Sequence, residues 1–232
     1  MADPPQSSQV WLAVETATPV GSVAVWRDGF ALELTLRIQG NHSERLLPAI
    51  DYALAATETE PEEVTSFVTG AGPGSFTGVR IAASMAKGWV MARGAALYAY
   101  SSLLVVAAGS GARGLVCPMF DARRGEVYGA CYDLRGGRVG ELMPPTARPI
   151  GPLLDELASR ELEPVFVGEG AIAYEDQIKD RFPRAQVQQE HVGFPRAASL
   201  LWLRRTVPAL GLIESPAEWE PEYVRDWRVT GG

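Results

Sequence analysis

A glycine-rich loop is the segment of the sequence best suited to hold a ligand. Gly70–Gly78 (GAGPGSFTG) lies between a predicted strand and a predicted helix, where backbone N–H groups can bind an anion. The loop lacks the G-K-[ST] of a phosphate-binding loop, and Ser75 stands where a G-x-G-x-x-G counted from Gly70 needs its third glycine. Pro73, two residues before Ser75, excludes the G-x-S-x-G turn of a serine hydrolase. Two interpretations remain open: a tight turn that needs positive φ, and an anion or nucleotide contact through Gly72, Gly74, Ser75, Thr77 and Gly78.

A second candidate is Glu15, which follows an apolar strand and precedes Thr16 and a threonine-containing turn. A phosphate-binding turn would need glycines directly after it, but Ala17 and Pro19 stand there. We therefore favour a strand-end carboxylate that is hydrogen-bonded to its own turn, with Glu15 and Thr16 kept as the alternative contacts to an anion or nucleotide.

Other residue types with catalytic potential are few and scattered. The two histidines, His42 and His191, are far apart, and no serine with a histidine and a carboxylate marks a triad. Neither histidine nor the two cysteines, Cys117 and Cys131, shows the spacing of a metal site. We predict no catalytic residue, no bound metal and two buried thiols.

The composition restricts the classes of function. The net charge of −7 and the pI near 5.0 disfavour a stand-alone nucleic-acid binder, because phosphate contacts need clustered cations. No apolar run reaches the roughly 18 residues of a membrane span. The polar start of the chain does not resemble a signal peptide. We expect a cytoplasmic protein with no membrane contact.

The elements that must position these residues are mixed strands and helices, which indicates the α/β class. Strands are predicted at 10–14, 22–26, 30–36, 66–70, around Tyr98, 115–120, 126–132 and 165–168; helices are predicted at 44–57, 79–93, 153–159, 171–181 and 197–207. We divide the chain into a disordered tail (1–9), an N-terminal lobe (10–105), a smaller second lobe (106–213) and a C-terminal tail (214–232). The last helix, 197–207, is a candidate to return to the first lobe.

Two of the predicted helices, 44–57 and 79–93, carry apolar residues on more than one side. A helix that is apolar nearly all round is normally covered on both sides. Either the lobe itself or a partner covers the second side. The predicted interface consists of Leu46, Leu47, Ile50, Tyr52, Ala53, Ala82, Met85, Ala86, Trp89 and Val90.

Five ordered motifs resemble one family, the TsaB (YeaZ-type) proteins. They are Leu12–Thr18 (LAVETAT), His42–Pro48 (HSERLLP), Gly72–Ile81 (GPGSFTGVRI), Asp121–Tyr128 (DARRGEVY) and Pro221–Arg225 (PEYVR). The resemblance covers about residues 10 to 228, and the glycine-loop motif is the most specific. The family usually has Asp where this chain has Glu15, the place where actin-like kinases and ATPases hold a phosphate-facing Asp.

This resemblance implies the actin-like ATPase, sugar kinase and heat-shock ATPase fold, with two related lobes. It implies a non-catalytic dimerisation and activating subunit that binds the paralogous enzyme TsaD. That enzyme transfers a threonylcarbamoyl group to N6 of adenosine 37 in tRNAs reading ANN codons. The resemblance also implies the ATPase TsaE as a partner, a homodimer when alone, and tRNA contact only through the complex.

The same resemblance bears on cofactors and on the main alternative. TsaD holds its metal through H-x-x-x-H, and the matching segment here, Tyr100–Val105, has no histidine. We expect no tightly bound cofactor and leave open ATP or ADP at the partner interface. The alternative is an actin-like-fold enzyme in its own right, either a small-molecule kinase or a glycoprotease-like peptidase.

Overall fold

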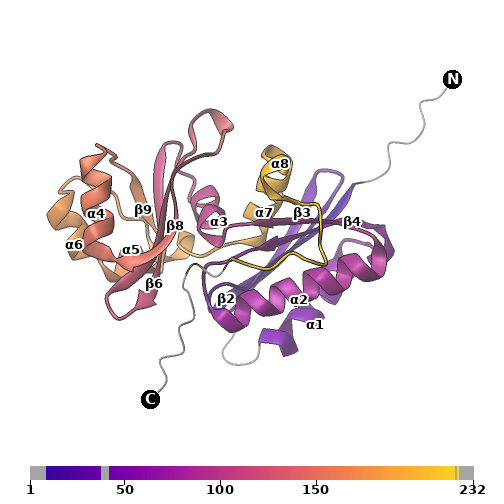
Figure 1. Ribbon diagram of the computed structural model, residues 1–232. Helices are drawn as coiled ribbons and strands as arrows, with labels where there is room; N and C mark the ends of the chain where they lie inside the picture. Colours follow the sequence, from indigo (N-terminus) through magenta and orange to yellow (C-terminus); the bar gives the residue numbers. More distant parts are fainter. Residues whose placement is uncertain (1–8, 38–41, 223, 225–232) are drawn as a thin grey trace, which may run out of the picture.

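The computed structural model describes residues 9–37, 42–222 and 224 (Figure 1). All of the predicted N-terminal tail except Gln9 therefore lies outside the described residues, as do residues 223 and 225–232 of the predicted C-terminal tail. The first sheet has the order β10-β5-β4-β1-β2-β3. Its strands are β1 (Val10–Glu15), β2 (Val20–Arg27), β3 (Phe30–Arg37), β4 (Val64–Gly70), β5 (Ala96–Tyr100) and β10 (Leu212–Ile213). The antiparallel β1-β2-β3 meander agrees with the short turns predicted between these strands.

The second sheet repeats the first in a smaller form, with the order β8-β7-β6-β9. Its strands are β6 (Leu115–Arg123), β7 (Glu126–Asp133), β8 (Gly140–Pro149) and β9 (Val165–Val167). In both sheets a three-stranded antiparallel meander is followed by a strand parallel to its first member, β4 beside β1 and β9 beside β6. This shared order gives the two related lobes of the expected α/β fold.

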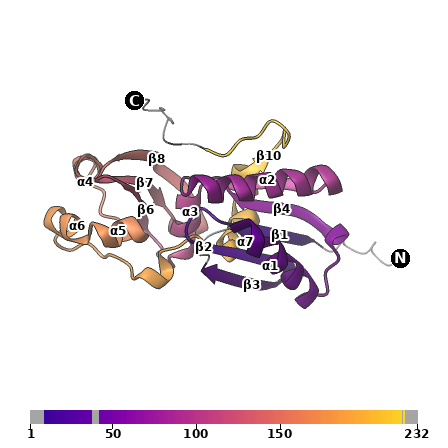
Figure 2. The ribbon, with the colours of Figure 1, turned by 90° about the horizontal axis from the view of Figure 1, so that it is seen from below.

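The helices form layers on both sheets (Figures 1 and 2). α1 (His42–Ala56) and α2 (Phe76–Arg93) cover one face of the first sheet. α7 (Ala197–Thr206) packs on β1, β2 and β4 at its other face, beside α3 (Ser102–Gly109) and α8 (Pro208–Gly211). α4 (Ile150–Ser159), α5 (Glu169–Ala173) and α6 (Glu175–Arg181) belong to the second lobe. Short 3₁₀ turns lie at Pro61–Glu63, Arg135–Gly137 and Glu190–Val192.

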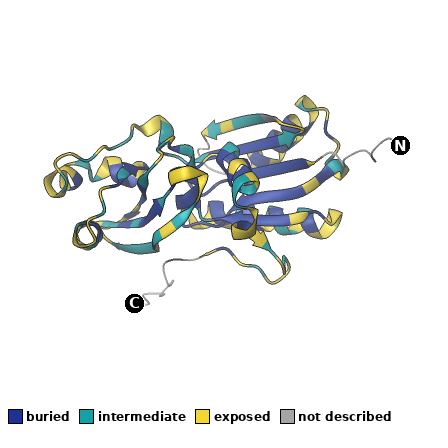
Figure 3. Ribbon diagram, turned by 90° about the horizontal axis from the view of Figure 1, so that it is seen from above, coloured by how far each residue is buried: buried dark blue, intermediate teal, exposed yellow. Residues whose placement is uncertain are grey.

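β1 shows how the sequence builds this layering. Successive strand residues point to opposite faces, and Leu12 packs toward α1 and α2 whereas Trp11 and Ala13 pack toward α3 and α7. Both faces are covered, so the strand is apolar at every position up to Glu15 and lies in the dark interior of Figure 3. Each fully buried side chain of the size of Leu12 stabilises the fold by about 1.5–3 kcal/mol.

A single apolar cluster joins the two lobes. It includes Tyr98 of the first sheet, Phe120 and Tyr132 of the second, and the side chains of α3 and α7. The predicted lobe boundary, between residues 105 and 106, lies inside α3. The lobes therefore share part of their core, and α7, from the second half of the chain, lies on the first sheet.

Candidate functional site

The glycine loop is packed directly against the turn between β1 and β2. Thr16 Oγ1 donates a hydrogen bond of 2.7 Å to Gly78 O, and Ser75 N donates one of 2.7 Å to Ala17 O. A Cβ on Gly78 would lie 1.9 Å from Thr16 O, and one on Gly74 would lie 2.3 Å from Ala17 O. These glycines are required because two backbone segments touch there.

This packing uses two of the N–H groups that could otherwise bind an anion. The N–H of Ser75 is bonded to Ala17, and the N–H of Gly78 donates to Ser75 Oγ at 3.3 Å, which caps α2. Gly72 has a φ of 88°, which the tight-turn interpretation requires. Thr77 is exposed beside the loop. The tight turn is thus the interpretation that the loop geometry supports.

Glu15 lies beneath this contact, with 1% of its surface exposed. Its Oε1 accepts a 2.7 Å hydrogen bond from Ala17 N, and its Oε2 accepts one of 3.1 Å from Ser102 Oγ. The predicted bond from Glu15 to its own turn is confirmed. Burial raises the pKa of Glu15 to about 7, against the opposing effect of these hydrogen bonds. A Cβ on Gly70 would lie 2.0 Å from Oε2, so Gly70 leaves room for the carboxyl.

The structure corrects more than half of the predicted helical interface. Six of its ten residues are buried in the core of the first lobe, so they are not available to a partner: Leu46, Ile50, Ala53, Ala82, Ala86 and Val90. The reason is that the sheet covers the apolar side on which they lie. Met85 and Trp89 are half-buried, and Trp89 packs against Phe67. Leu47 and Tyr52 are exposed, at 55% and 62%.

The exposed residues of α1 and α2 adjoin a hollow of about 580 Å³. Its lining is Leu47, Phe76, Thr77, Arg80, Ile81, Ser84 and Met85, and we call it the α1/α2 hollow. Phe76, at 49% exposure, was missed because the predicted helix began at Val79, whereas α2 begins at Phe76. The Arg80 guanidinium lies 4.9 Å from the centre of the Phe76 ring.

A cleft of about 660 Å³ lies between the lobes and was not predicted from the sequence. Tyr100 and Ser101 line it from the first lobe, and Tyr132 and Glu141 line it from β7 and β8. Glu222 closes the lining from the C-terminal segment, which we define as residues 214–222. This segment runs beside α2 in Figure 2, where Lys87 pairs with Glu220 at 2.7 Å, and Glu222 N donates to Ala71 O at 2.9 Å.

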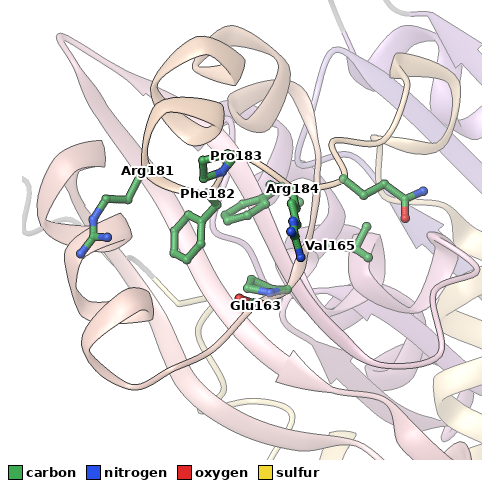
Figure 4. Close-up of a pocket in the computed structure, with 10 residues that line it drawn as sticks. Glu163, Val165, Arg181, Phe182, Pro183 and Arg184 are labelled. Carbon is green, nitrogen blue, oxygen red and sulfur yellow. The ribbon is translucent and has the colours of Figure 1, made fainter.

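A third pocket, of about 460 Å³, lies at the outer end of the second lobe. Figure 4 shows Glu163, Phe182 and Arg184 around it, whereas the side chain of Arg181 extends away from them. Arg181 is paired with Asp155 at 3.2 Å. Arg181 therefore directs its charge away from the pocket.

The remaining candidates lie apart from these hollows. Cys117 and Cys131 are buried free thiols, as predicted, and burial raises the pKa of both. Within residues 9–37, 42–222 and 224, no group of three or more His, Cys, Asp or Glu side chains is placed to hold a metal ion. None of the helices in that described part is long and apolar enough to cross a membrane.

Comparisons with known proteins show which family this chain resembles in sequence and in structure. A family model described as TsaD, tRNA N6-adenosine threonylcarbamoyltransferase, matches residues 37–223. The tRNA threonylcarbamoyladenosine biosynthesis protein TsaB of Escherichia coli is 32% identical over 95% of this chain and 98% of its own length. The protein of the same name from Bacillus subtilis is 31% identical over 73% of this chain and 75% of its own.

The chain belongs to the TsaB family. A solved structure of YeaZ from Pseudomonas aeruginosa agrees, with a TM-score of 0.80 and 28% identity over 93% of this chain and 99% of that one. A second structure from that organism, described as similar to peptidase YeaZ, has a TM-score of 0.82 and 28% identity over 94% of this chain and 100% of its own. The expected TsaB family and its α/β fold of two related lobes are confirmed.

Proposed function

We propose that this chain is a non-catalytic subunit in tRNA threonylcarbamoyladenosine biosynthesis, where it binds TsaD and supports threonylcarbamoyl transfer to adenosine 37. The names of the Escherichia coli and Bacillus subtilis relatives support the pathway. The observation that carries the binding role is the α1/α2 hollow, with the exposed side chains of Leu47 and Phe76 in its lining.

The chemistry of the hollow favours a protein partner. Exposed apolar side chains that gather around a hollow usually mark an interaction site, whereas single exposed ones do not. Of the lining residues only Arg80 is charged, and its guanidinium stacks on Phe76. Burial of aromatic anchors such as Phe76 in a partner's surface supplies much of the binding energy in typical interfaces.

The packed glycine loop supports the non-catalytic role. A kinase needs backbone amides and an acidic residue that face the phosphates. Here the Ser75 amide is bonded to Ala17, and Glu15 is buried between its own turn and Ser102. A phosphate group has no room between Gly78 and Thr16, whose backbones touch.

The rest of the assembly follows from this arrangement. In the proposal, a second copy of the chain covers the α1/α2 hollow when TsaD is absent, so the homodimer and the TsaD complex exclude each other. TsaE joins the TsaD-bound form, and ATP or ADP, where it is held, lies at the partner interface. The acidic chain, with its net charge of −7, reaches tRNA through the complex in the cytoplasm.

The test replaces apolar residues at the hollow by glutamate. Leu47→Glu and Phe76→Glu should abolish co-purification with TsaD and lower the threonylcarbamoyladenosine content of cellular tRNA, measured by mass spectrometry, to the level of a deletion strain. Met91→Glu is the matched control, because Met91 is an exposed residue of α2 outside the hollow. Circular dichroism must show that all three variants fold. Retained TsaD binding by folded Phe76→Glu would refute the proposed surface.

A further inference from the structure

The cleft between the lobes gathers acidic groups. Its lining includes Glu141, Glu220 and Glu222, but no lysine, arginine or histidine among the described residues. Glu220 is neutralised by Lys87. Glu141 and Glu222 have no ion pair within the described part of the chain, and both are exposed, so they form the rim of the cleft.

Two hydroxyl groups without partners lie below this rim. Tyr132 is 1% exposed, yet its hydroxyl has no hydrogen-bond partner among the described residues, and the same holds for Ser101 Oγ. Both residues line the cleft. Burial raises the pKa of Tyr132, the Ser101 hydroxyl nearby lowers it, and the charges of Glu141 and Glu222 raise it further. Both carboxylates therefore act on the same hydroxyl, which belongs to a residue that lines the cleft.

Buried hydroxyls are almost always hydrogen-bonded, because one without a partner is unfavourable. Tyr132 and Ser101 come from the two different lobes, so a group bound between them would contact both. A water molecule satisfies a hydroxyl, but it does not neutralise the two carboxylates above it. The combination favours a ligand with hydrogen-bond donors and a positive charge.

The remaining walls of the cleft determine the body of that ligand. They are apolar side chains from both lobes and the C-terminal segment: Leu104, Val139, Pro144, Pro145, Leu210, Ile213 and Trp219. The volume of about 660 Å³ is in the range of small-molecule sites. Apolar walls do not ligate a bare metal ion, whereas an aliphatic chain packs against them.

We propose that this cleft binds a small organic cation, a primary amine or a guanidine on an aliphatic chain. The cationic group pairs with Glu141 and Glu222 and donates to the Tyr132 and Ser101 hydroxyls, and the chain lies against Trp219 and the prolines of β8. Phosphate-bearing molecules are excluded by repulsion from the same carboxylates. The proposal is independent of the α1/α2 hollow and of TsaD binding.

The experiment uses the full chain and matched ligands. Agmatine and n-pentylamine, titrated in a low-salt buffer near neutral pH and followed by calorimetry and NMR, should bind with one site per chain. 1-Pentanol and pentanoate, which have the same length as pentylamine but no positive charge, should bind at least tenfold more weakly. Absence of saturation by both cations at about 10 mM, or equal binding of 1-pentanol, would overturn the proposal.

Variants locate the site. Glu141→Gln and Glu222→Gln should each weaken agmatine binding at least tenfold, and Tyr132→Phe should weaken it about fivefold, the effect of one hydrogen bond. Glu163→Gln, which removes the same charge from an exposed position outside the cleft, should stay within twofold of the unchanged protein. An equal loss in Glu163→Gln would mean that the cations bind to the acidic surface in general and would refute the site.

Discussion

The two lobes carry the same hairpin at the same place in their sheets, but they use it differently. The β1–β2 turn, residues 16–19, follows the buried Glu15 and is packed against the glycine loop. The corresponding β6–β7 hairpin ends in Arg123, Arg124 and Gly125, all exposed. One turn is part of the core, and the other projects into solvent.

The two turns differ because the glycines of each lobe contact different parts of the hairpin. After β4, Gly74 and Gly78 touch the backbone of the turn itself, at Ala17 and Thr16. After β9, Gly168 touches Met119, which lies within the buried part of β6 and not in the turn. The second lobe thus closes on the strand and leaves its turn free. In these two lobes, the position of the glycine contact along the strand determines whether the turn is covered or exposed.

The strongest way to break this comparison is Gly78→Ala. Alanine would normally stabilise a helix by about 1 kcal/mol relative to glycine. Here its Cβ would lie 1.9 Å from Thr16 O, and because that atom is backbone, relief requires α2 or the turn to move. We expect a loss of more than about 3 kcal/mol in the free energy of unfolding, measured by urea denaturation.

Gly88→Ala is the matched control for this substitution. Gly88 lies in the same helix, α2, and a Cβ there meets nothing within 4 Å. It should stabilise the protein by up to about 1 kcal/mol. Equal and small effects of the two alanines would show that the turn and the loop are not in contact in solution.

A second test addresses the buried carboxyl of the first lobe. The pKa of Glu15, raised from 4.5 to about 7, means that the folded protein prefers the protonated form. The stability that this protonated group contributes is fully present below pH 4.5 and is lost as the pH rises to 7. Glu15→Gln should therefore match the unchanged protein near pH 5 and exceed it by up to about 3 kcal/mol near pH 8.

The comparison with the second lobe supplies the control for Glu15. Asp121 is exposed on the corresponding hairpin, where its Oδ1 accepts a 2.8 Å hydrogen bond from Arg123 N. Asp121→Asn should change the free energy of unfolding by less than about 0.5 kcal/mol at both pH values. If Glu15→Gln gave no gain at pH 8, the carboxyl would not be held in an apolar environment.

Much of the fold was predictable because apolar periodicity is strong in the first lobe. The strands β1, β2 and β3 and the helices α1 and α2 were predicted within a few residues of their observed bounds. The short α8 and β10 were missed, and so were two longer elements, α3 and β8. α3 is apolar on nearly all sides, so it shows no helical periodicity. β8 contains three prolines, which an edge strand tolerates and an inner strand does not.

The sites were less predictable, because each depends on contacts between distant segments. The sequence indicated the glycine loop as a candidate site. It did not indicate that the Ser75 amide would donate a hydrogen bond to Ala17 O. The sequence also showed that α1 and α2 have two apolar sides, but it did not show which side the sheet covers. The lobe cleft joins Tyr132, Glu141 and Glu222 from three segments, one of which is the unpredicted β8. Which of these side chains are buried and which are hydrogen-bonded depends on contacts between distant segments, so it could not be predicted from local sequence patterns.

The smallest predicted effect concerns the free hairpin of the second lobe. Arg123 and Arg124 have positive φ, 65° and 57°, a region that costs most non-glycine residues about 1 kcal/mol and that asparagine tolerates better. Arg124→Asn should therefore raise the free energy of unfolding by about 0.5 kcal/mol. Arg138→Asn, at an exposed arginine with a φ of −100°, should give no gain.

The same variant tests whether these strained arginines serve tRNA. Residues held in unfavourable backbone regions often have a function. The other two adjacent arginines, Arg204 and Arg205, already stack on aromatic rings: Arg204 on Tyr98 at 3.9 Å and Arg205 on Trp26 at 5.5 Å. The proposed complex places tRNA contacts on its other subunits, so Arg124→Asn should leave threonylcarbamoyladenosine levels unchanged in cells. A fall in the modified nucleoside with an unchanged amount of folded protein would instead make the open hairpin a tRNA contact, and the difference between the two lobes would then be functional as well as structural.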